Sequence, residues 1–117
     1  MQKFANARDA KEFLIGSIIA ESQREGVPLS EVERKMLYFS ETAWTLPDIA
    51  EVNDIFDRDY NQADYEQKIG KLIRNLHAHA RTNNREHFDD WTEAVRIVRR
   101  EDHYLLALID AAESKSL

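Results

Sequence analysis

The residues best suited to chemistry in this chain are histidines that lie close together in its second half. His77, His79 and His87 occur there, with Asp89 just behind them. Imidazole nitrogens and carboxylate oxygens bind Zn²⁺ and related divalent ions. If the chain forms an antiparallel helical hairpin about Asn83, position 79 comes to lie opposite about position 87. The sequence therefore indicates a candidate metal site made of His79, His87 and Asp89.

The spacing of these histidines departs from established metal motifs. His77 and His79 are two residues apart, so on a helix they point about 160° away from each other and cannot both face one ion. The chain contains neither His-Glu-x-x-His nor the Glu-x-x-His pair of di-iron bundles. In the simpler interpretation, His79 is hydrogen-bonded at the edge of an apolar seam, and His77 and His87 are surface residues near a helix end. No cofactor is predicted. Metal binding around residues 77–90, with or without catalysis, stays the alternative function.

A second pattern suited to metal ions lies at Asp57, Asp59 and Asn61, which match positions one, three and five of a calcium-binding loop. The later positions do not match. Gln62 replaces the turn glycine at position six, and Lys68 stands where such a loop needs a bidentate glutamate. We interpret the segment as a polar turn in which Asp and Asn side chains cap helix ends.

Groups that could perform catalysis are present but form no known arrangement. Glu51, Asp54 and Asp57 stand three residues apart, as carboxylates do on many solvated helix faces. None of the serines lies in a Gly-x-Ser-x-Gly elbow. The three glycines are isolated, so no glycine-rich loop is available to bind phosphates. The sequence favours a protein without enzymatic activity.

A basic surface is the best candidate for a functional region. Lys71, Arg74, Arg81 and Arg85 lie on the side of a predicted helix opposite its apolar seam. Residues 66–100 carry 8 Lys and Arg against 5 Asp and Glu, a net charge of +3, whereas both flanking parts of the chain are acidic. Such a surface fits an acidic protein partner or a second copy of the chain. The alternative is a solvated face whose charges pair locally.

Composition limits the class of protein. The 117 residues carry a net charge of −6, which disfavours nucleic acid as the main partner because phosphate binding needs a basic surface. The chain has no cysteine, so disulfides and thiolate chemistry are excluded and the cytoplasm is the simplest expected location. The longest apolar stretch, residues 13–20, would extend about 12 Å as a helix, far less than the roughly 30 Å thickness of a membrane core. We therefore expect no membrane association.

The spacing of apolar residues predicts helices throughout. From Lys71 to Leu117 the chain has neither glycine nor proline, and apolar residues recur there three and four apart. Both prolines, Pro28 and Pro47, stand next to expected helix starts. The sequence predicts an all-α fold, a compact single-domain bundle of five to six helices that is mostly antiparallel and includes residues 1–117.

Local signals place the ends of the expected helices. The first covers about residues 6–25, with Gly26 just beyond its end. Ser30 and Glu33 form a capping box at the start of the second, which is expected to continue to Ala43. Further helices are expected at about residues 48–56, 61–82 and 84–113, the last with a break or kink near residues 101–103.

The expected function follows from the wide apolar face near the C-terminus. Leu105 to Ile109 is almost continuously apolar, which is more than one buried helix face needs. We expect a helical module that binds another protein or itself, in the second case as a homodimer. Asp102 falls on the inward seam, so we expect it to be at least partly buried and bonded to Tyr65, to Lys68 or to a helix N-terminus.

Overall fold

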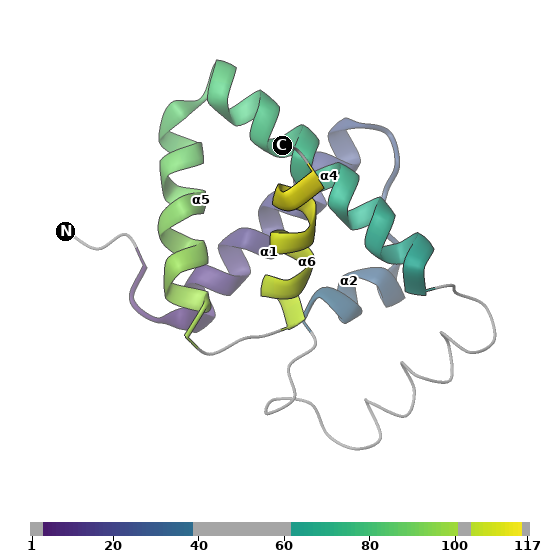
Figure 1. The fold of residues 1–117 in the computed structure, drawn as a ribbon, viewed down its shortest axis with the longest axis horizontal. Helices are drawn as coiled ribbons and strands as arrows, with labels where there is room; N and C mark the ends of the chain where they lie inside the picture. The colour runs from purple at the N-terminus through teal and green to yellow at the C-terminus, as the bar shows by residue number, and fades with distance from the viewer. Residues whose placement is uncertain (1–3, 39–61, 101–103, 116–117) are drawn as a thin grey trace.

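The fold consists of helices, as the sequence predicts. The computed structural model describes residues 4–38, 62–100 and 104–115, and no strand occurs among them. Figure 1 shows the helices of these ranges, which are α1 (Ala7–Arg24), α2 (Glu31–Leu37), α4 (Gln62–Asn83), α5 (Arg85–Val98) and α6 (Tyr104–Lys115). The all-α class is thereby confirmed. The helix expected at 48–56 and the calcium-like segment at 57–61 lie outside the described residues.

Helix α1 begins and ends where the sequence places it. The Asn6 side chain accepts a hydrogen bond from the Asp9 backbone N–H at 2.9 Å, which satisfies a free donor of the first turn. At the other end Gly26 has a φ of 73°, a conformation that glycine adopts at little cost. The Val27 N–H then donates to the Ser22 carbonyl at 2.9 Å and closes the helix end.

Helix α2 starts with the predicted capping box. The Ser30 hydroxyl accepts from the Glu33 N–H at 3.1 Å, and the Glu33 carboxylate accepts from the Ser30 N–H at 2.9 Å. The helix ends at Leu37, before the predicted end at Ala43, and the Tyr38 N–H turns back to the carbonyl three residues earlier at 3.1 Å. Residues 39–43 lie outside the described ranges.

The capping glutamate also joins α2 to α4. Lys68 Nζ lies 3.0 Å from a carboxylate oxygen of Glu33, and the Tyr65 hydroxyl donates to the Glu33 backbone carbonyl at 3.3 Å. Burial acts to raise the pKa of Glu33, but hydrogen bonds from Ser30 and Lys68 outweigh it, and the pKa lies below its ordinary value. Tyr65 and Lys68, the expected partners of Asp102, thus both contact Glu33. Asp102 itself lies outside the described residues.

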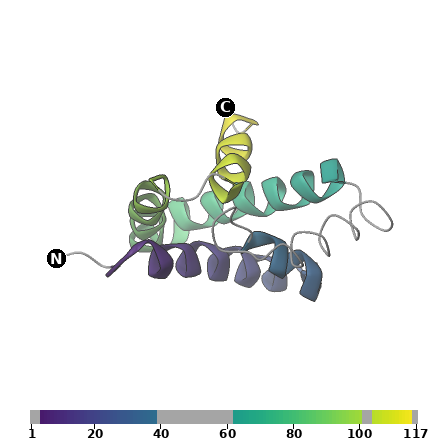
Figure 2. The same ribbon diagram turned by 90° about the horizontal axis from the view of Figure 1, so that it is seen from below.

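Helix α4 is buried on two sides. In the side view of Figure 2 it lies between α1 below and α6 above, and it packs against both. The predicted seam faces the core, and further α4 residues that the seam does not include are buried as well, namely Ile73, His77 and Ala80. The four seam residues, all at most 5% exposed, are Tyr65, Ile69, Leu72 and Leu76.

The expected hairpin between α4 and α5 is instead a corner. Helix α4 ends at Asn83, and the Asn84 side chain begins α5 by accepting from the His87 N–H at 3.1 Å, one residue later than predicted. From this corner α5 packs along α1, while α4 runs away from it toward α2 (Figure 1). The two helices therefore do not run side by side, and residues 79 and 87 do not lie opposite each other as the hairpin would place them.

The expected long helix over residues 84–113 is two helices, because α5 ends at Val98, a turn follows at residues 99–100, and α6 is a separate helix from Tyr104. Residues 101–103 lie outside the described residues. Helix α6 packs on α4. Its wide apolar face is used inside this one chain, since the exposed fractions of Leu105, Leu106 and Ile109 are 0%, 4% and 0%. The face that motivated the expectation of a homodimer is therefore already covered.

Candidate functional site

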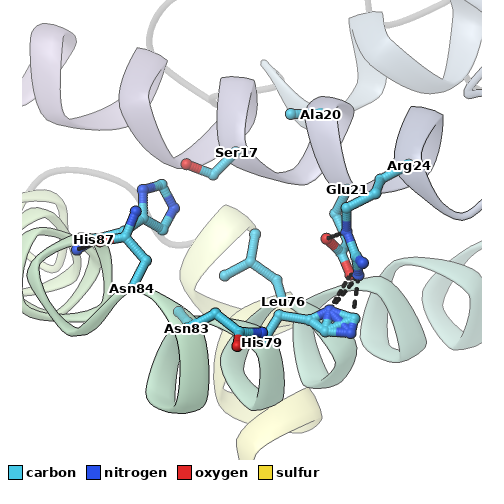
Figure 3. A pocket seen from close by; sticks show the side chains of 10 residues that line it. Ser17, Ala20, Glu21, Arg24, Leu76, His79, Asn83, Asn84 and His87 are labelled. Atoms are coloured by element: carbon cyan, nitrogen blue, oxygen red, sulfur yellow. Dashed lines mark hydrogen bonds and ion pairs between the residues drawn. The ribbon is translucent and has the colours of Figure 1, made fainter.

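The three predicted metal ligands have separate neighbours. Figure 3 shows His79 and His87 at opposite ends of a pocket between α1, α4 and α5. The ring of His87 lies 5.1 Å from the ring of Phe13, centroid to centroid, and Asp89 pairs with Arg85 at 3.8 Å. The only cluster of possible metal ligands among the described residues contains His79 but neither of the other two. The corner between α4 and α5 is the cause of the separation.

The cluster that does contain His79 joins α4 to α1. Glu21, Glu25 and His79 offer ligand atoms that all lie within 4.8 Å of one another. The positively charged side chain of Arg24 already lies next to these ligand atoms. The guanidinium of Arg24 binds both oxygens of the Glu21 carboxylate, at 2.9 Å and 2.5 Å, and also contacts the His79 ring (Figure 3). Because Glu21 is only 6% exposed, its charge needs this partner, and we interpret the cluster as a structural link.

Polar groups in the wall of the pocket beside this cluster are used in hydrogen bonds within the helices. It encloses about 350 Å³. The Ser17 hydroxyl in its wall donates to the Phe13 carbonyl at 2.8 Å, and the Asn84 side chain is the N-cap of α5. These groups stabilise helices. Sequence reasoning missed Glu21 as a buried charge, although its position three residues after Ile18, on the apolar face of α1, was a usable signal.

A larger groove lies between α5 and α6, and we call it the α5–α6 groove. It encloses about 600 Å³. Helix α4 contributes His77 and Arg81 to it, α5 contributes an aromatic and apolar wall, and α6 contributes a polar wall. The residues of those two walls are Phe88, Trp91, Thr92 and Val95 on α5, and Asp110, Glu113 and Ser114 on α6.

His77 lies deep beside this groove, which corrects the prediction of a surface residue. It is 7% exposed, because α6 packs over a second side of α4. Its ring meets those of Phe88 and Trp91 edge to face, at centroid distances of 5.7 Å and 5.2 Å. Burial, helped by the positive charge of Arg81, lowers the pKa of His77 to about 4. The imidazole is therefore neutral at neutral pH.

Two buried nitrogens at the groove have no hydrogen-bond partner among the described residues. They are Nε2 of His77 and Nε1 of Trp91. His77 Nε2 lies 4.0 Å from a carboxylate oxygen of Glu113, too far for a hydrogen bond. Burial and the neighbouring Asp110 raise the pKa of Glu113.

The groove has one basic end and one acidic wall. At the basic end, the guanidinium carbons of Arg81 and Arg85 lie 5.0 Å and 6.0 Å from the centre of the Phe88 ring. On the opposite wall, Asp110 is held by the Arg99 guanidinium at 3.0 Å and 3.2 Å. Opposite charges on α4 and α6 thus face each other across the groove.

The predicted basic surface is divided by this geometry. Arg81 lines the groove, and Arg85 lies beside it, with its guanidinium carbon 6.0 Å from the centre of the Phe88 ring. Lys71 is exposed further along α4. Arg74 is half-buried beside Gly70, where an added Cβ would lie 3.2 Å from its guanidinium. One of the four predicted residues therefore lines the groove, and a second lies next to it.

In comparisons with known proteins, no family profile, no curated protein and no solved structure matches this chain. Among the described residues, no helix combines the length and the apolar character needed to cross a membrane.

Proposed function

We propose that this protein is a non-enzymatic helical interaction module of the cytoplasm that binds a protein partner in the α5–α6 groove. The proposal depends on the composition of the groove, whose lining includes Arg81, Phe88 and Trp91. Arginine and the large aromatic residues contribute most of the binding energy in protein interfaces. The volume of about 600 Å³ falls within the range of known binding pockets.

Binding is favoured over catalysis by the burial of the one histidine in the groove. His77 and Glu113 have pKa values displaced in opposite directions, as an acid and a base of an enzyme can have. A catalytic base must reach the proton that it removes. Nε2 of His77 is buried, so a substrate in the groove has no direct contact with this nitrogen. We therefore assign the aromatic and charged lining to recognition.

A partner with a different sequence is favoured over a second copy. The apolar segment of α6 was the reason to expect a homodimer, and its large side chains pack inside the chain. Of the large apolar side chains, those that the structure describes as exposed are Val27 and Tyr38, and neither lines the groove. A second copy is thus not needed to cover an apolar face.

The test is a selection for binding peptides followed by obstruction of the groove. Purified protein is used to select binders from a phage-displayed library of random peptides, and the affinity of synthetic copies is measured by fluorescence anisotropy. Thr92 is exposed in the groove, so Thr92→Trp fills it. Thr82→Trp is the matched control, because Thr82 is also exposed and both hydroxyls donate to the carbonyl four residues earlier.

We expect Thr92→Trp to abolish peptide binding and Thr82→Trp to leave it unchanged. Both variants should keep the helical circular dichroism of the wild type, since each position is exposed. If no peptide is selected, or if both variants bind peptide as the wild type does, the groove is not the docking site and the proposal is wrong.

A further inference from the structure

The basic end of the α5–α6 groove indicates the chemistry of the partner. We infer that the groove binds an acidic segment of another protein, with a carboxylate held by Arg81 and Arg85 and an adjacent apolar side chain packed on Phe88 and Val95. This inference rests on the proposed function and names the class of partner that the groove accepts.

The two arginines are placed to bind one carboxylate. Both guanidinium carbons lie within 6.0 Å of the centre of the same ring, that of Phe88. Stacking on an aromatic ring leaves the edge of a guanidinium free for the paired hydrogen bonds that a carboxylate accepts. Arg85 forms an ion pair with Asp89 at 3.8 Å, but both side chains are well exposed, at 76% and 68%, so the pair is weak.

The acidic wall fixes the direction of the bound segment. Glu113 and Asp110 lie on α6, across the groove from Arg81. Asp110 already pairs with Arg99 at 3.0 Å, so the wall repels a bound carboxylate chiefly through Glu113, whereas a neutral or basic residue is accepted. The bound segment therefore places its carboxylate at the corner of α4 and α5, and a residue that is not acidic over α6.

The same wall argues against nucleic acid as the occupant. A phosphate backbone carries negative charge along its whole length, so it meets the carboxylates of Asp110 and Glu113 as well as the two arginines. The whole chain has a net charge of −6, which adds repulsion at long range. A peptide can place a single carboxylate at the basic end and avoid this repulsion.

The experiment uses the peptides that the wild-type protein selects. We expect them to share an acidic residue next to an apolar one. Arg81→Glu with Arg85→Glu should weaken their binding at least about tenfold, and a Glu→Lys change in the peptide should restore binding to that variant. The matched control is Arg8→Glu with Arg34→Glu, which changes the net charge equally on exposed helix positions. Arg8 resembles Arg85 in having an ion pair four residues away, with Glu12 at 3.7 Å.

The outcomes separate the two proposals. If peptides bind and Thr92→Trp blocks them, but the reversal of Arg81 and Arg85 has no effect, the inference is wrong and the docking groove stands. If the Arg8 and Arg34 control weakens binding as much, only net charge acts and the inference is also wrong. If light scattering finds a wild-type dimer that Thr92→Trp dissociates, the occupant is a second copy. A Glu→Gln change in the peptide tests the carboxylate even if a protein variant does not fold, and unchanged affinity would contradict the inference.

Discussion

His77 makes the packing around the α5–α6 groove sensitive to acid. Its pKa is about 4 in the folded protein against 6.5 for an ordinary histidine, first because burial disfavours the imidazolium and second because Arg81 repels it. Between these values the unfolded chain binds more protons than the folded one. The contribution of His77 to stability is therefore complete above about pH 6.5 and decreases as the pH falls toward 4.

Replacement of the histidine by a ring that cannot take up a proton should remove this sensitivity. His77→Phe keeps the edge-to-face contacts with Phe88 and Trp91. In urea unfolding measured across the window from pH 6.5 to 4, we expect the wild type to lose more stability than the variant. Glu113 acts in the opposite direction because its pKa is raised, and it is present in both proteins. Equal losses in both proteins would show that His77 is not the titrating group.

The capping box at the start of α2 gives a second prediction about a single residue. Ser30→Ala removes the acceptor for the Glu33 N–H and should lower the free energy of unfolding by about 0.5–2 kcal/mol. Ser114→Ala, on an exposed position in the last turn of α6, is the control and should change it little. Urea unfolding of both variants at neutral pH provides the comparison. Equal effects would mean that the cap does not stabilise α2.

In helix α1, replacement of two glycines by alanine should change the stability of the protein in opposite directions. Gly16 lies within the helix, and Gly26 lies just beyond its C-terminus. Gly16 lies inside the helix with open space around an added Cβ, so Gly16→Ala should stabilise the protein by roughly 0.5–1 kcal/mol. Gly26 has a positive φ, so Gly26→Ala should destabilise it by about 1 kcal/mol or more. Thermal unfolding followed by circular dichroism measures both. A stabilised Gly26→Ala protein would contradict the described end of α1.

The junction of α1 and α4 gives a test of the metal alternative. Because the Arg24 guanidinium already binds the Glu21 carboxylate, we expect no stabilisation of the wild type by Zn²⁺ or Mn²⁺. The measurement is the unfolding temperature with added metal and with a chelator, on protein without a histidine tag. A rise with metal that a chelator reverses would contradict this expectation and favour the metal alternative.

The sequence predicts helix ends well and helix packing poorly, and the reason is physical. Asn6, Gly26 and the Ser30 box act on backbone groups within one turn, so their effect can be read from neighbouring residues. The burial of His77 depends on α6, which follows much later in the chain and covers a second side of α4. The single apolar seam that the sequence predicts on α4 does not indicate that α6 packs against a second side of this helix.

The α5–α6 groove could not be predicted from the sequence for the same reason. The sequence predicts one basic surface made of Lys71, Arg74, Arg81 and Arg85. The corner after Asn83 brings only Arg81 and Arg85 to the ring of Phe88. The opposing carboxylates come from α6. A groove made by three helices depends on the angles between them, and no local pattern encodes those angles.

For the whole molecule, we propose that a partner segment occupies the space between α5 and α6. The most direct measurement is a two-dimensional NMR titration of the labelled protein with a selected peptide. We expect the backbone amide signals of Thr92 and Ser114, on the two walls of the groove, to shift together with the Trp91 indole signal, while that of Thr82 stays in place. Shifts that spare Thr92 and Ser114 and gather instead around Glu21 and His79, or on α2, would contradict it.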